Sequence, residues 1–132
     1  MAQLSVAVRN ARLDAIESTI GVSPTMEIRT GAAPANCAAA DSGTLLASIT
    51  LPSDWLAAAA SGQKALSGTW QDLTADATGT PGHYRIKAGA TCHMQGSASG
   101  PGGGGELLFD TADFTTGQQV NVTSFTLTDG NA

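Results

Sequence analysis

Residues 82–95 read GHYRIKAGATCHMQ, and this stretch decides the fold class. Tyr84 and Ile86 alternate with polar residues before a short loop, and Cys92 and Met94 alternate with polar residues after it. Alternation on both sides is typical of two strands with one buried face, and a three-residue loop containing glycine joins strands in a known hairpin class. The pattern therefore predicts a β-hairpin.

The facing of the side chains predicts the register of this hairpin. Pairing Lys87 with Thr91 sets Arg85 opposite His93 on the outer, solvent-exposed face, which His83 shares. On the inner face, the same register gives two pairs: Ile86 with Cys92, and Tyr84 with Met94.

Other segments with strand-like composition flank the hairpin. The predicted strands are 25–29, 45–51, 67–73, 106–110 and 120–128. The apolar residues of the last strand change parity in its middle, which predicts a β-bulge near Thr123 and Ser124. Residues 53–62 fit either a short helix or an irregular loop. Residues 31–43 fit a connecting loop, and the glycine-rich stretch Gly100–Gly105 predicts an exposed, mobile loop.

The N-terminal segment predicts the one long helix. Ser5 precedes the periodic stretch, Gly21 can adopt the left-handed conformation after the last turn, and Pro24 prevents continuation. A narrow apolar stripe, available to this chain or to a neighbouring subunit, consists of Val6, Leu13, Ile16 and Ile20. We therefore divide the chain into a helix over 1–22 and one domain over 23–132.

Taken together, these elements predict a mainly β fold. Six or seven short strands without βαβ alternation favour an antiparallel β-sandwich or jelly-roll with one N-terminal α-helix. With 132 residues, one core is expected, and aromatic residues make up only 5% of the chain, so its large side chains are few.

Charge and hydropathy exclude several function classes. The net charge is −5, and no Lys or Arg follows Lys87, which disfavours nucleic acid as a partner of the C-terminal half. No apolar run reaches the roughly 18 residues of a membrane span, and the start of the sequence lacks the order of a signal peptide. We expect synthesis in a cytosol and no membrane partner.

The cysteines and histidines do not have the spacing of a metal site. Cys92 and His93 are adjacent in one strand, so their side chains face opposite sides of the sheet. Of His83, Cys92 and His93, only the two histidines could therefore bind the same ion. We predict neither metal nor cofactor. Cys37 and Cys92 could form a disulfide, but a cytosolic origin favours free thiols.

No residues form a catalytic pattern. The serines lack a nucleophile elbow, the glycine run lacks the ending of a phosphate loop, and Asp110 and Asp113 fit a turn. We therefore predict that the chain is not an enzyme. Trp55 and Trp70 are candidates for contact with a sugar ring, but the preferred interpretation places them in a core that has few other large residues.

Several phrases occur in an order that resembles the small virion structural proteins of tailed bacteriophages. The phrases are VRNARLDAI at 8–16, IRTGAAP at 28–34, TLP at 50–52, GTW at 68–70, GHYRI at 82–86 and FTLTDG at 125–130. The resemblance extends over almost the whole chain and includes no catalytic motif.

This resemblance implies an accessory protein of the virion, assembled in the host bacterial cytoplasm. The first candidate is a capsid decoration or cement protein that bridges capsid subunits, with the major capsid protein or another virion protein as partner. A thin core also favours a homo-oligomer, and a trimer suits threefold positions of a shell. The alternative is an adhesive or fibre-associated module that binds host glycans through Trp55, Trp70 or Gly100–Gly105.

Overall fold

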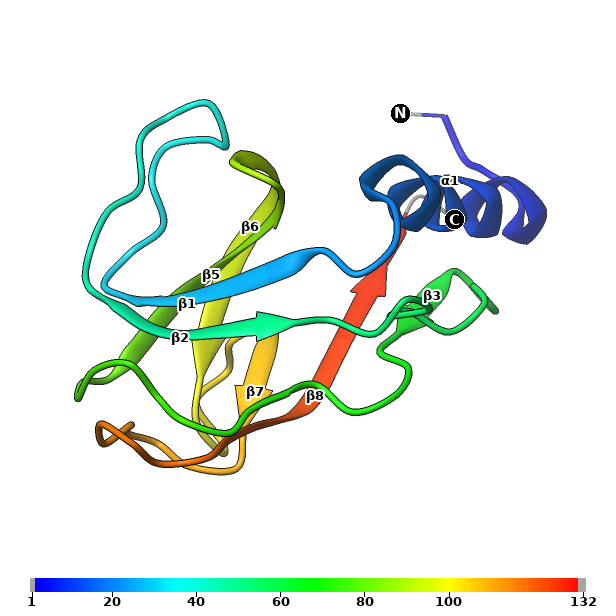
Figure 1. Ribbon diagram of the computed structural model, residues 1–132. Helices are drawn as coiled ribbons and strands as arrows, with labels where there is room; N and C mark the ends of the chain where they lie inside the picture. The colour runs from blue at the N-terminus through cyan, green and yellow to red at the C-terminus, as the bar shows by residue number, and fades with distance from the viewer. Residues whose placement is uncertain (1, 131–132) are drawn as a thin grey trace.

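Figure 1 shows the computed structural model of the protein, which describes residues 2–130. Within that range the chain forms one helix and eight strands. Their bounds are α1 Val6–Ile20, β1 Thr25–Thr30, β2 Leu45–Thr50, β3 Gln63–Ala65, β4 Gln71–Asp72, β5 Pro81–Ala88, β6 Thr91–Ser99, β7 Leu107–Phe109 and β8 Val120–Thr128. The predicted mainly β class with one N-terminal helix is confirmed.

Helix α1 is shorter than the segment 1–22 assigned to it, but it begins after Ser5 and ends before Gly21 as expected, because both its ends are capped. The hydroxyl of Ser5 accepts a hydrogen bond from the Val8 backbone N–H at 3.3 Å. At the other end Gly21 takes a positive φ of 97°, and its N–H donates to the carbonyl of Glu17. Glycine tolerates this backbone conformation without steric cost, so the helix ends there.

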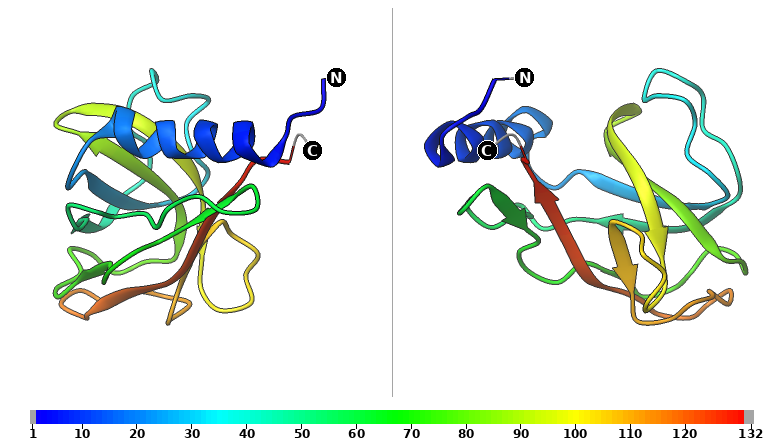
Figure 2. Two further views of the ribbon diagram at one scale, coloured as in Figure 1. Left: turned by 90° about the vertical axis from the view of Figure 1, so that its right-hand side faces the viewer. Right: turned by 180° about the vertical axis from the view of Figure 1, so that it is seen from behind.

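The strands form a single mixed sheet in the order β2-β1-β5-β6-β7-β8-β3, and β4 also pairs with β8. Neighbouring strands are antiparallel except β6 and β7, which run parallel. The sheet curls, as Figure 2 shows, until β2 approaches the segment that begins with β4. There the Ser48 N–H donates to Asp72 Oδ2 at 3.1 Å, and the Asp76 N–H donates to the Leu46 carbonyl at 2.7 Å. Backbone groups at the β2 end of the sheet are thereby satisfied.

The core inside this curled sheet is built around a row of aromatic rings. Trp70 lies between Trp55 and Phe125, with ring centroids 6.0 Å and 5.3 Å away. Tyr84 meets Phe125 edge-on at 5.5 Å. Large rings bury more apolar area than any other side chains, so these few residues compensate for the many small ones. The placement of both tryptophans in the core is confirmed.

The hairpin of β5 and β6 exists, but its predicted register is wrong. Lys87 pairs with Cys92 rather than with Thr91, and Arg85 pairs with Gln95 rather than with His93. The remaining pairs are Ala88 with Thr91, Ile86 with Met94, Tyr84 with Gly96 and His83 with Ser97. A register shift near His93 inserts one unpaired residue, and strict counting from the loop does not anticipate such a bulge.

The predicted bulge in β8 is confirmed. Leu108 pairs with Ser124 and Phe109 pairs with Val122, so Thr123 is the extra residue. The bulge returns Phe125 to the buried face after Val120 and lets both strand halves contribute to one core.

Other boundaries need correction. The predicted strand over 67–73 contains only the two residues of β4, and residues 53–62 form a loop with isolated bridges rather than a helix. Within Gly100–Gly105, residues 101–104 are exposed, but Gly100 is buried. A Cβ at Gly100 would overlap the backbone of Ala112, which requires a residue without a side chain there.

Candidate functional site

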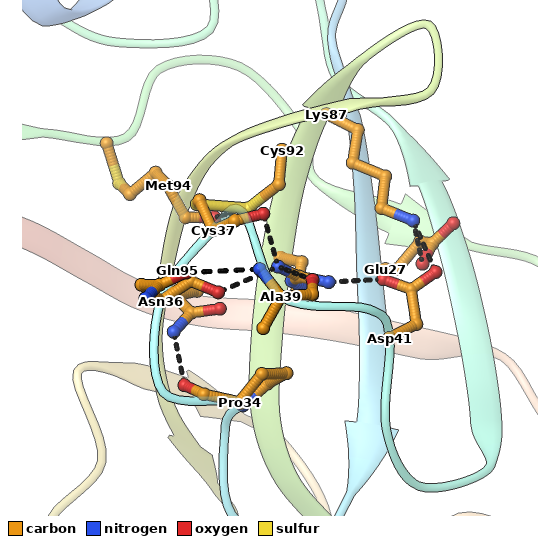
Figure 3. Close-up of a disulfide and its surroundings, with 11 residues drawn as sticks. Glu27, Pro34, Asn36, Cys37, Ala39, Asp41, Lys87, Cys92, Met94 and Gln95 are labelled. Atoms are coloured by element: carbon orange, nitrogen blue, oxygen red, sulfur yellow. Dashed lines mark hydrogen bonds and ion pairs between the residues drawn. A yellow bond between two sulfur atoms is a disulfide. The ribbon is translucent and has the colours of Figure 1, made fainter.

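The loop over residues 31–43 folds back across the outer face of β5 (Figure 3). His83 Nδ1 lies 2.9 Å from the carbonyl oxygen of Gly31, and a Cβ at Gly82 would overlap the Gly31 backbone. The prediction that the His83, Arg85 and Lys87 side of the hairpin faces solvent is therefore wrong. All three residues are buried, because β5 has the core on one face and this loop on the other.

Arg85 of β5 binds the inner side of the loop, which faces the sheet. Its side chain is 2% exposed and reaches Asp41 through Nη1. Nη2 donates to the carbonyls of Cys37 at 2.9 Å and Ala39 at 3.1 Å. One guanidinium thus satisfies several acceptors of a segment without regular secondary structure, and its planar donor geometry suits this function.

Three further charged residues extend the contact between Arg85 and Asp41 into a network. Lys87 Nζ lies 2.7 Å from Asp41 Oδ2 and 3.0 Å from Glu27 Oε1. Arg29 Nη2 lies 2.9 Å from the same Glu27 oxygen. We call Glu27, Arg29, Asp41, Arg85 and Lys87 the outer charge cluster. Its three cations and two carboxylates connect β1, β5 and the loop.

The outer charge cluster shifts the protonation of its members. A hydrogen bond from Lys87, reinforced by Arg85 and Arg29, lowers the pKa of Asp41 to about 2. Burial disfavours the ammonium of Lys87, but the hydrogen bonds to Asp41 and Glu27 outweigh it and raise its pKa. Both groups are therefore charged at neutral pH.

We expect the contribution of Asp41 to stability to disappear in acid. Its pKa in the folded chain lies below the ordinary value of 3.8, so the contribution is complete above about pH 4 and is lost as the pH falls through 2. The one-third exposed side chain limits it to about 1 kcal/mol. Chemical denaturation should show the stability difference between wild-type protein and Asp41→Asn shrinking through this pH range. A constant difference would contradict the assignment.

A disulfide between Cys37 and Cys92 joins the loop to β6. The prediction that both cysteines are free thiols is therefore wrong. The Cα atoms lie 5.2 Å apart although 55 positions separate them in the sequence. The cellular compartment does not determine where the loop folds, and the fold of the loop is what brings the two thiols together. No spacing signal in the sequence pairs these two residues.

A second set of charges fixes helix α1 to its own chain. Lys64, 2% exposed, lies 2.7 Å from Asp14 Oδ1 and 3.1 Å from Glu17 Oε1. The Glu17 carboxylate also accepts from the Leu56 N–H at 3.1 Å, and Asn10 Oδ1 accepts from the Gly62 N–H at 2.9 Å. The helix therefore packs within its own chain, over β3 and the preceding loop.

Hydrogen bonds from Lys64 and from the Ala59 N–H lower the pKa of Asp14. Burial disfavours the Lys64 ammonium, but its bonds to Asp14 and Glu17 outweigh this and raise the Lys64 pKa. Sequence periodicity gave no sign of this contact because its members come from separate segments.

We expect Lys64→Met to lower the free energy of unfolding by about 1 to 2 kcal/mol. Methionine fills the buried path of the lysine stem but leaves both carboxylates without their cation. Denaturant titration measures the loss, and hydrogen exchange should accelerate in α1 while β5 is unchanged. Uniform acceleration in both elements would contradict a local role.

The predicted stripe on α1 is only partly available to a partner. Leu13 and Ile20 are buried in this chain, and Ile16 is half-buried against the core. Val6 is 46% exposed and is the member that faces solvent. The stripe therefore serves mainly to pack the helix on its own sheet.

The tryptophans do not form a glycan platform. Trp55 is fully buried, and its Nε1 donates to the Gly21 carbonyl at 3.0 Å. Trp70 is 1% exposed, and its Nε1 donates to the Ser67 carbonyl at 3.1 Å. Stacking on a sugar needs an exposed ring face, and both indoles are buried. The suggestion that Trp55 and Trp70 bind a glycan is therefore wrong.

The other candidate groups have structural partners. Cys92 is bonded to Cys37, Asp110 accepts from Asn121 Nδ2 at 2.9 Å, and Asp113 accepts from the Thr80 hydroxyl. Across residues 2–130, His, Cys, Asp and Glu form no group of three suited to a metal ion. No helix in that part of the chain has the length and apolar character for crossing a membrane.

No known protein family, curated protein or solved structure matches this chain.

Proposed function

We propose that this chain is a bacteriophage virion protein, a capsid decoration or cement protein that stabilises the head by bridging capsid subunits. Its partners would be the major capsid protein or another virion protein, and a homo-oligomer, most simply a trimer, suits a threefold position of the shell. The sequence phrases that resemble small virion structural proteins support this role.

The main support for this proposal is that two separate links hold the loop over residues 31–43. The Cys37–Cys92 disulfide holds the segment 31–43 on β6, and the outer charge cluster holds the same segment on β5. Disulfides persist in oxidising surroundings, and a released particle is exposed to such surroundings. A small domain with few large apolar residues gains much of its rigidity from such links. A protein that joins shell subunits needs a rigid body and complementary surfaces more than reactive groups.

The deciding experiment compares particles with and without this chain. Particles assembled without it should lose their contents at lower temperature or lower salt than complete particles, and added purified chain should restore resistance at a fixed copy number per shell. Equal resistance with and without the chain would refute the proposal. Binding at a few copies, confined to the tail, would also refute it.

A further inference from the structure

The Cys37–Cys92 disulfide lines a hollow on the surface of the molecule. The hollow measures about 460 Å³ and lies between the loop over residues 31–43 and the tip of the β5–β6 hairpin. Its walls include both cysteines, the small residues 38–40 of the loop and Ala90 of the hairpin turn. Both cysteines are only partly buried. Sites for small molecules commonly have volumes of roughly 300–1,000 Å³, so a small thiol can reach the sulfur atoms while the chain stays folded.

A second set of links holds the loop beside the disulfide without using either sulfur atom. Arg85 Nη2 donates to the carbonyl of Cys37 itself at 2.9 Å, so the backbone of this cysteine is bound to β5. Further along the loop Asp41 pairs with the same guanidinium, and before the cysteine Gln95 Nε2 donates to the Pro34 carbonyl at 2.6 Å. Figure 3 shows the loop from Pro34 to Asp41 with these contacts. With the S–S bond open, Cys37 is therefore still held next to the hairpin.

Opening the bond uncovers no part of the core. The core lies on the other face of β5, where Tyr84 and Ile86 are buried. Cys92 lies opposite Lys87 in the hairpin, and directly opposite residues share a face, so the disulfide belongs to the outer face. Two thiols restrained in this way remain close together, and their high effective concentration favours re-formation of the bond.

We propose that Cys37 and Cys92 form a reversible redox site, at which small thiols and disulfides of the glutathione class open and close the bond while the chain stays folded. This redox site goes beyond the proposed role in a shell and does not depend on it. The surroundings set its state, since reduced thiols favour the open form and their disulfides favour the closed form.

The bond opens in two exchange steps. The thiolate of one reagent molecule attacks a sulfur atom of the bond, which forms a mixed disulfide and releases the other cysteine as a thiolate that takes a proton from water. A second reagent thiolate attacks the reagent sulfur of the mixed disulfide and releases the remaining cysteine, which is protonated in the same way. The two reagent molecules are oxidised to their disulfide and the cysteine pair is reduced. The reverse sequence closes the bond.

The first measurement follows the opening of the bond in the full-length oxidised protein by reduced glutathione, with thiol trapping and intact mass as the readout. We expect the rate to rise in proportion to the glutathione concentration. Urea added below the unfolding transition should change the rate less than about twofold, because the folded chain already exposes the bond. A rate that rises with urea in parallel with the unfolded fraction would overturn the inference, because the thiol would then reach the bond only in the unfolded chain.

The second measurement is hydrogen exchange over residues 31–43 with the bond closed and open. The stabilising effect of a disulfide falls mainly on the unfolded chain, so reduction of the wild-type protein should accelerate exchange in the loop by less than about tenfold. One reporter is the Ala39 N–H, which donates to the Asn36 carbonyl at 3.1 Å.

Asp41→Asn removes the ion pairs of the loop and tests whether the two links share their task. We expect the substitution to accelerate loop exchange about fivefold in the reduced chain but less than about twofold in the oxidised chain, where the disulfide still holds the segment. The matched control Asp110→Asn, beyond β7 and outside the loop, should change exchange over 31–43 in neither redox state.

Two results of the exchange measurements would overturn the inference. Loss of all protection over 31–43 on reduction of the wild-type protein would show that the disulfide alone holds the loop. Equal effects of Asp41→Asn in both redox states would show that the two links do not restrain the same segment. The wild-type measurements decide the question even if the variant does not fold, and the comparison of particles tests the proposed function separately.

Discussion

Replacing both cysteines, Cys37→Ser with Cys92→Ser, is expected to lower the free energy of unfolding by about 4 kcal/mol. The disulfide joins positions 55 residues apart, so the unfolded chain regains much conformational freedom when it is absent. Denaturant titration in non-reducing buffer measures the difference. Because the outer charge cluster holds the same loop, we expect the variant still to fold.

The control is the wild-type protein in the same titration with a reductant, which should match the double variant. A loss below about 1 kcal/mol would show that the disulfide does not constrain the chain as described. An intact mass that reduction leaves unchanged would contradict the bond itself.

Trp70→Ala is expected to cost about 3 to 5 kcal/mol. Trp70 is 1% exposed and contacts the rings of Trp55 and Phe125, so alanine would leave a cavity at the centre of a core that has few large residues. The shift of the unfolding midpoint in denaturant measures the cost, and Trp70→Phe, which retains a ring, should lose less.

The matched control is Leu73→Ala, three residues further along the chain, where leucine is 65% exposed. We expect that change to stay within about 0.5 kcal/mol. Similar losses at the two positions would contradict the description of Trp70 as a central core residue.

Local patterns predicted the elements of this chain well. The helix ends, at Ser5 and Gly21, depend on capping residues within one turn, and the bulge at Thr123 depends on parity within one strand. The burial of Trp70 followed from size alone. Such features are determined by neighbouring residues, so a single sequence is sufficient to indicate them.

The candidate sites were harder to predict because they depend on long-range folding. Alternation correctly placed Arg85 and Lys87 on the face opposite Ile86, but it could not show that residues 31–43 would cover that face. The disulfide and the Lys64 contacts have the same origin, since each joins segments that are far apart in the sequence. Periodicity reports which way a side chain points and not what lies there.

The proposed function places this chain in the shell of a virus particle. Electron cryo-microscopy of the intact particle tests it most directly, because one map gives location, copy number and symmetry. We predict density with this fold at the joints between capsid subunits, present at every equivalent position. A fully resolved shell without such density, or density for this fold confined to the tail or fibres, would contradict the claim.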